Sequence, residues 1–129
     1  MLDTNICIYV IKSKPLEVLN QFNEHSGQLS ISSITFAELI HGAEKSEFVE
    51  RNLRTVEDFC SRLEILCYGD KAAAHYGSIR SDLEKKGKVI EVNDLHIAGH
   101  ARSEGLVLVS NNLKEFHRVD ALRTDNWIK

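Results

Sequence analysis

The sequence has little that would point to a membrane, secreted or zinc-finger protein. Its longest apolar run spans only positions 6–11, too short to cross a bilayer. The start also lacks the basic flank and cleavage site of a signal peptide. The three cysteines are an odd number without C-x-x-C spacing, which fits neither a disulfide framework nor a zinc knuckle. With a net charge of −3, the chain is not expected to coat nucleic acid non-specifically.

The overall composition is that of a globular protein. Of the 129 residues, 43% are apolar and 27% are charged, and there is one proline. We see no internal repeat and no linker rich in Pro, Gly or Ser. A single domain over 1–129 is therefore predicted, in a soluble protein of the cytoplasm.

Short apolar segments alternate with helical patterns along the chain. Strands are predicted at 1–2, 28–32, 64–68 and 106–110, with a short extended piece at 88–92 before Asp94 and a last short strand within 118–128. The segment 106–110 (LVLVS) is apolar up to its serine, as expected of a buried parallel strand. Because helical segments separate the strands, the sequence predicts an α/β domain with a mainly parallel sheet flanked by helices. Ligands bind at the carboxyl ends of the strands in such sheets.

Three carboxylates follow separate predicted strands. Asp3 leaves the first strand, where capping of the next helix is the simplest explanation. Glu38 lies among apolar residues on the helix after the second strand, although a surface position would explain it as well. Asp94 shares a helix face with Ile97, and Asn93 is expected to cap that helix, which leaves Asp94 without a capping role. Burying such a carboxylate costs several kcal/mol unless a cation or hydrogen-bond donors compensate.

An amide-rich loop follows the most apolar predicted strand. It contains Asn111 and Asn112, followed by Glu115, and turn formation alone would also explain the asparagines. Each of these signals is weak alone, but together they put oxygen ligands at one edge of a parallel sheet. Oxygen ligands without His or Cys favour Mg²⁺ or Mn²⁺. A site of this kind is suited to phosphodiester hydrolysis.

These residues resemble the PIN-domain ribonucleases, and the VapC toxins of bacterial toxin–antitoxin pairs in particular. The similarity covers nearly the whole chain and rests on segments in the family's order and spacing: DTN near the start, TFAEL, NDLHIA, and SNNLKEF. The resemblance implies a PIN-like three-layer fold. In this family several residues usually precede the DTN segment, whereas only Met1 and Leu2 do here. Either the first strand is clipped or the native chain starts earlier.

The resemblance also implies roles for individual residues. Asp3 and Asp94 would bind the metal directly, and Glu38 directly or through water. Many PIN domains have a fourth acid at the position of Asn112, so a second metal ion would be held less firmly here. The residues expected to support the site are Asn112, Glu115 and Asn5.

The expected activity follows from the same resemblance. The chain would be a Mg²⁺-dependent endoribonuclease toxin acting on tRNA, with the anticodon loop of initiator tRNA as the expected target. A VapB-type antitoxin would neutralise it, and homodimers would form inside a larger complex. A basic antitoxin tail is expected to pair with the acids. The helix at 6–11 and the apolar stripe of 47–62 would offer grooves for that peptide or for the dimer.

Three other functions are compatible with parts of the pattern. A haloacid-dehalogenase-like phosphatase also uses an Asp after its first strand, but it needs a second acid where Asn5 stands. A zinc hydrolase would use His96 and His100, but H-E-x-x-H requires Glu at the position of Ile97, so exposed histidines are expected instead. A PIN-fold RNA-binding or interaction module with weak or no catalysis is the third alternative; the retained acids argue against it, and Asn112 leaves it open.

Overall fold

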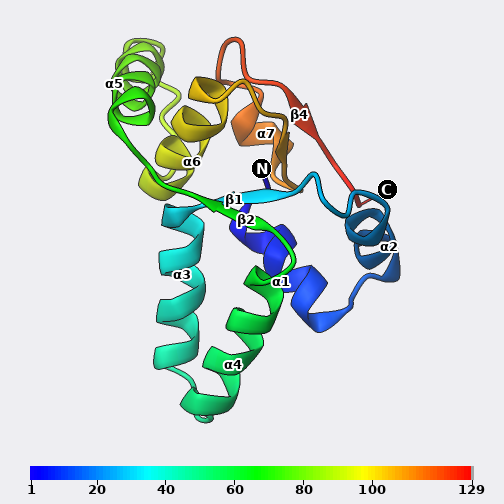
Figure 1. Cartoon of the computed structure of the whole chain (residues 1–129). Coiled ribbons are helices and arrows are strands. Elements are labelled where there is room, and N and C mark those ends of the chain that lie inside the picture. The colour runs from blue at the N-terminus through cyan, green and yellow to red at the C-terminus, as the bar shows by residue number, and fades with distance from the viewer. Residues whose placement is uncertain (129) are drawn as a thin grey trace.

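The computed structural model describes residues 1–128 and alternates helices with short strands (Figure 1). In chain order the elements are α1 (Thr4–Lys12), α2 (Leu16–Glu24), β1 (Ser30–Ser32), α3 (Ser33–Glu44), α4 (Val49–Cys60), β2 (Glu64–Leu66), α5 (Asp70–Lys85), α6 (Val92–Ser103), β3 (Leu108–Val109), α7 (Leu113–Phe116) and β4 (Thr124–Asp125). None of the described helices is long and apolar enough to cross a membrane.

The first residues of the chain join two pairs of parallel strands into one sheet. β1 pairs with β2, and β3 pairs with β4, both in parallel. Leu2 forms a parallel bridge with Val109, and its N–H donates to the Ser30 carbonyl at 2.9 Å. The next N–H, that of Asp3, donates to the Val109 carbonyl at 2.9 Å. The segment 1–3 therefore acts as the central strand, and Asp3 lies at its carboxyl end.

Helices cover both faces of this sheet, as Figure 1 shows for α5 and α6 on one side and α1, α3 and α4 on the other. Adjacent residues of β3 point to opposite faces, so Leu108 belongs to one buried cluster and Val109 to the other. Leu2 and Ile31 are fully buried with Val109 against α1. The apolar segment at 6–11 thereby holds the start of α1, and with it Asp3, against the core.

Most of the predicted elements are found, and the α/β prediction is confirmed. The strands are shorter than predicted, because only a few residues of each segment form a ladder. Residues 86–91 form no strand, so Asp94, unlike Asp3, does not directly follow one. One capping prediction is wrong: α6 begins at Val92, and the Glu91 side chain caps it in place of Asn93. Trp127, within the segment predicted to hold the last strand, is buried in the core.

Candidate active site

Asp3 is a buried carboxylate at the centre of the sheet edge. It caps α1, and its Oδ1 accepts from the Thr4 N–H at 2.7 Å. Its Oδ2 accepts from the Ser110 hydroxyl, which follows β3, at 2.8 Å. Burial raises the pKa of Asp3, the two hydrogen bonds oppose this, and the charges of Glu38 and Glu91 raise the pKa further. Asp3 is thus both a helix cap, as the simpler explanation had it, and an acid held close to other acids.

Asp94 lies in the first turn of α6 and is half-buried. Burial, followed by the charges of Asp3 and Glu91, raises its pKa to about 7. The expectation that it shares a core-facing stripe fits the burial of Ile97 and Ala98, one turn further along the helix. The charged form of Asp94 is therefore unfavourable, unless a bound cation offsets its burial and the repulsion from the neighbouring acids.

Glu38 is half-buried on α3 and is attached to the same edge of the sheet through Thr4. The Thr4 hydroxyl donates to Glu38 Oε1 at 2.6 Å, and the buried Thr35 hydroxyl lies 3.3 Å from the same Thr4 oxygen. Thr4 directly follows Asp3, so this hydrogen bond links α3 to the start of α1. The charge of Glu38 contributes to the raised pKa of both Asp3 and Asp94.

The loop after β3 contributes in a way that the sequence only partly predicted. Asn112 was expected to support the site, but it is Ser110 that contacts Asp3, and the Ser110 hydroxyl also accepts from the Asn112 N–H at 2.9 Å. Glu115 on α7 is close enough for its charge to raise the pKa of Asp94. Asn5 is exposed on α1. The supporting roles of Asn112, Glu115 and Asn5 stay predictions.

The oxygen atoms gathered here fit a hard divalent cation. Two carboxyl groups with raised pKa values repel each other when ionised, and a cation between them would remove that repulsion. The buried Oδ1 of Asn111, next to Ser110, has no hydrogen-bond partner among the described residues. As the side chains stand, residues 1–128 contain no group of three or more His, Cys, Asp or Glu side chains that could hold a metal ion. The carboxylates are therefore close enough for their charges to interact, but their side chains are not arranged as a complete set of direct metal ligands.

The two histidines of α6 are not exposed, so that expectation is wrong. His100 is 1% exposed, and its Nδ1 lies 2.7 Å from Ser32 Oγ. His96 is half-buried, with its Nδ1 2.7 Å from the Tyr68 hydroxyl and its ring stacked on Tyr76. Burial lowers the pKa of both rings. Their contacts give them structural roles and provide no zinc site.

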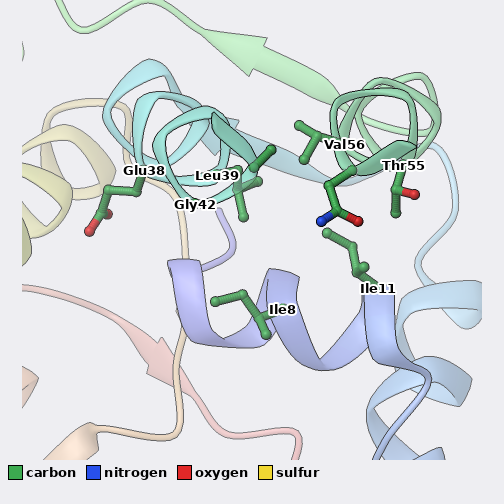
Figure 2. Close-up of a pocket in the computed structure, with 9 residues that line it drawn as sticks. Ile8, Ile11, Glu38, Leu39, Gly42, Thr55 and Val56 are labelled. Carbon is green, nitrogen blue, oxygen red and sulfur yellow. The ribbon is translucent and has the colours of Figure 1, made fainter. Parts of the chain in front are cut away.

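An apolar groove of about 190 Å³ lies between α1, α3 and α4, beside the acids (Figure 2). Ile8 and Ile11 of α1 form one wall, and Leu39 and Val56 form the opposite one. Figure 2 shows Glu38 at the border of the groove, with its carboxylate pointing away from Ile8. The groove and the acidic site therefore share Glu38.

Comparison with known proteins gives a consistent result. The PIN domain family model matches residues 1–122. "Ribonuclease VapC2" of Haemophilus influenzae is 64% identical over 128 residues, which cover 99% of this chain and 97% of that protein. "tRNA(fMet)-specific endonuclease VapC" of Shigella flexneri is 53% identical, with 98% of this chain and 96% of that protein covered.

Chains in solved structures have a closely similar fold. A DNA-bound VapBC complex from Salmonella typhimurium contains a chain with a TM-score of 0.94 and 53% identity, covering 98% of this chain and 96% of that one. A chain of VapBC-1 from nontypeable Haemophilus influenzae has a TM-score of 0.91 and 39% identity, covering 100% of this chain and 98% of that one.

Proposed function

Because the chain belongs to the PIN-domain family, whose model matches residues 1–122, we propose that it is a metal-dependent endoribonuclease. The family match also confirms the predicted PIN-like fold and rules against a haloacid-dehalogenase-like phosphatase. The observation that carries the proposal is the convergence of Asp3 and Asp94 at the carboxyl edge of the sheet, where burial and then the charges of Asp3 and Glu91 raise the pKa of Asp94 to about 7. We also propose that 1–129 is a single PIN domain and that the protein acts in the cytoplasm.

In this proposal Asp3 and Asp94 bind the cation, Mg²⁺ or Mn²⁺, and Glu38 binds it directly or through water. A bound cation would lower the pKa of water and stabilise the charge that develops on the phosphate. Ser110 holds the carboxylate of Asp3, and Thr4 holds that of Glu38, so that neither acid reorients freely. These two hydroxyls keep the acids in place for the cation and the RNA.

The products should be those of hydrolysis by water, with 5′-phosphate and 3′-hydroxyl ends. Attack by the RNA 2′-hydroxyl typically relies on a pair of histidines as general base and general acid, and the histidines of α6 are not placed as such a pair. His100 is buried against Ser32, and His96 is bonded to Tyr68 and stacked on Tyr76.

The proposed substrate is tRNA, with the anticodon loop of initiator tRNA as the cleavage site. Support comes from the Shigella flexneri relative, 53% identical, whose name specifies tRNA(fMet). Sequence-specific recognition of RNA generally targets single-stranded loops, where bases are accessible.

We further propose that a VapB-type antitoxin neutralises the chain, in an assembly that contains a homodimer. The solved relatives are VapBC complexes, which supports the partner. An apolar antitoxin segment would occupy the groove between α1, α3 and α4, and an adjacent Arg would reach past Glu38 to the acids. Such a peptide would block the active site while filling an apolar surface.

Gly42, which lines the groove, offers a test of the partner. A Cβ at Gly42 would meet nothing within 4 Å, so α3 has room for a side chain there, and Gly42→Leu would place an apolar side chain at the groove. We expect it to weaken binding of the VapB chain of the Salmonella typhimurium complex by at least about tenfold, a loss of about 1.4 kcal/mol. Gly77→Leu on α5, where a Cβ also meets nothing, is the control. Equal affinity of the two variants would contradict the docking site.

The function itself is tested by incubating the protein with total tRNA and Mg²⁺ and sequencing the fragment ends. The parent should cut at one or a few sites, Asp94→Asn should not, and Glu50→Gln, an exposed acid of α4, should cut like the parent. RNA binding without cleavage by the parent would instead support a non-catalytic module. The lack of a closed ligand set among the described acids is the observation that favours this second candidate.

A further inference from the structure

Glu91 is an acid at the active-site edge that the sequence pattern did not single out. It directly precedes α6 and is exposed. Its side chain folds back over the start of the helix, where Oε2 accepts from the Asp94 N–H at 3.1 Å. The carboxylate thus lies over the helix end that carries Asp94.

The charge of Glu91 acts on both of the proposed metal ligands. Among the charges that raise the pKa of Asp94, it ranks after Asp3 and ahead of Glu115 and Glu38. It also contributes to the raised pKa of Asp3. The hydrogen bond to the Asp94 N–H places the Glu91 carboxylate at the first turn of α6, beside one of the proposed ligands.

A negative charge at the N-terminus of α6 would favour cation binding at Asp94. The N-terminus of α6 carries a partial positive charge from its unpaired N–H groups, and this charge opposes a cation bound at Asp94. A carboxylate directly over that terminus neutralises it. Glu91 occupies this place, whereas the other acids approach from α1, α3 and α7.

We infer that Glu91 is a further carboxylate of the proposed metal centre: it positions Asp94 through the N–H bond and strengthens divalent-cation binding through its charge. The inference rests on the proposed function, because it requires that a cation bind at Asp3 and Asp94. It assigns Glu91 a positioning role and leaves the reacting atoms to the other acids.

Helix capping alone is the competing explanation, and Glu91→Gln separates the two. Glutamine keeps a side-chain oxygen that can accept from the Asp94 N–H, but it has no charge. Alanine removes both the acceptor and the charge. If Glu91 only caps the helix, Glu91→Gln should keep both the stability and the Mn²⁺ affinity of the parent, and only Glu91→Ala should lose stability. If Glu91 also supports the metal site, both substitutions should weaken Mn²⁺ binding.

The experiment is a calorimetric titration of the full chain with Mn²⁺ in the absence of RNA, with thermal melts of each variant in EDTA. We expect Glu91→Gln to melt no lower than the parent in EDTA, because it keeps the cap and relieves part of the repulsion on Asp94. We expect it to bind Mn²⁺ roughly tenfold more weakly, as is typical of losing a group that supports a metal ligand. Glu50→Gln, an exposed acid in the first turn of α4, is the charge-matched control and should bind as the parent does.

Three outcomes would overturn the inference. Unchanged Mn²⁺ affinity in Glu91→Gln, with destabilisation only in Glu91→Ala, would reduce Glu91 to a helix cap while the proposed function stands. A parent chain that binds no Mn²⁺ would overturn the proposed metal centre and the inference with it. An equal loss of affinity in Glu91→Gln and Glu50→Gln would also overturn it, because a general loss of negative charge would then explain the effect.

Discussion

Replacing Asp94 with Asn should stabilise the metal-free protein, although it removes a proposed metal ligand. In the folded chain the pKa of Asp94 is raised from 3.8 to about 7, mainly by burial and then by the charges of Asp3 and Glu91. Asn has nearly the same volume and no charge. The substitution therefore removes the repulsion and part of the desolvation cost without opening a cavity.

The size of the effect follows from the raised pKa. A change from 3.8 to about 7 is roughly three pKa units, or about 4 kcal/mol at about 1.4 kcal/mol each. Asp94 is only half-buried, and solvent screening lowers this to roughly 1–2 kcal/mol. For a chain of this length the melting temperature should rise by about 3–5 °C per kcal/mol.

The stabilisation has a defined pH dependence. Because the folded chain binds the Asp94 proton more tightly than the unfolded chain, the parent loses stability as the pH rises from about 4 to about 7. Asp94→Asn lacks this loss. The two proteins should therefore melt together near pH 4 and differ most at pH 7 and above.

Paired melting curves in EDTA and in Mg²⁺ measure the repulsion in the metal-free protein and the contribution of Asp94 to metal binding. At a hundredfold excess over its Kd, Mg²⁺ should stabilise the parent by about 2.7 kcal/mol and the variant much less. A variant that melts below the parent in EDTA at pH 8 would refute the repulsion argument. Equal stabilisation of both proteins by Mg²⁺ would remove Asp94 from the metal site.

Three further substitutions test the packing of α5 on α6 and the electrostatics of the site. A Cβ at Gly99 would lie 2.9 Å from the Tyr76 backbone N, so Gly99→Ala should force α5 and α6 apart and cost about 1–3 kcal/mol in chemical unfolding. Gly77→Ala, with open space at its Cβ, should instead gain up to about 1 kcal/mol, and similar values for both would contradict the close contact. Ser110→Ala removes a hydrogen bond that lowers the pKa of Asp3, so the acidic limb of the cleavage-rate profile should move to higher pH. An unmoved limb would show that this bond does not tune Asp3.

The sequence predicted well what depends on periodicity and on strand ends. The apolar segment 106–110 contains β3, and the DTN segment places Asp3 at the end of the central strand. These features are local: a carboxylate directly after an apolar strand emerges at the carboxyl edge of the sheet. The alternation of strands and helices likewise predicts the α/β fold, which the structure confirms.

The sequence failed where tertiary contacts decide the outcome. His96 and His100 were expected to be exposed, but Tyr76 of α5 covers His96 and Ser32 of β1 contacts His100. The pattern of residues along α6 does not show which of its faces α5 will cover. Glu91 was overlooked because glutamate is an uncommon cap and Asn93 is a favourable one. A carboxylate three residues before Asp94 was the available signal.

The role of Ser110 depends on a contact between residues that are distant in the sequence. Ser110 was noted as the end of an apolar strand, but its contact with Asp3 joins residues that are 107 positions apart. Only the register between the segment 1–3 and β3 places the hydroxyl on the carboxylate. The asparagines beside it drew attention instead, because amides resemble metal ligands in sequence more than a serine does.

The chemical identity of the RNA ends tests the central claim most directly. Purified protein should be incubated with tRNA in Mg²⁺ and, in parallel, in EDTA, and the fragment ends should be examined for their phosphates. The proposed metal-dependent hydrolysis at Asp3, Glu38 and Asp94 predicts 5′-phosphate and 3′-hydroxyl ends in Mg²⁺ and intact RNA in EDTA. Ends carrying a 2′,3′-cyclic phosphate, or equal cleavage in EDTA, would contradict it.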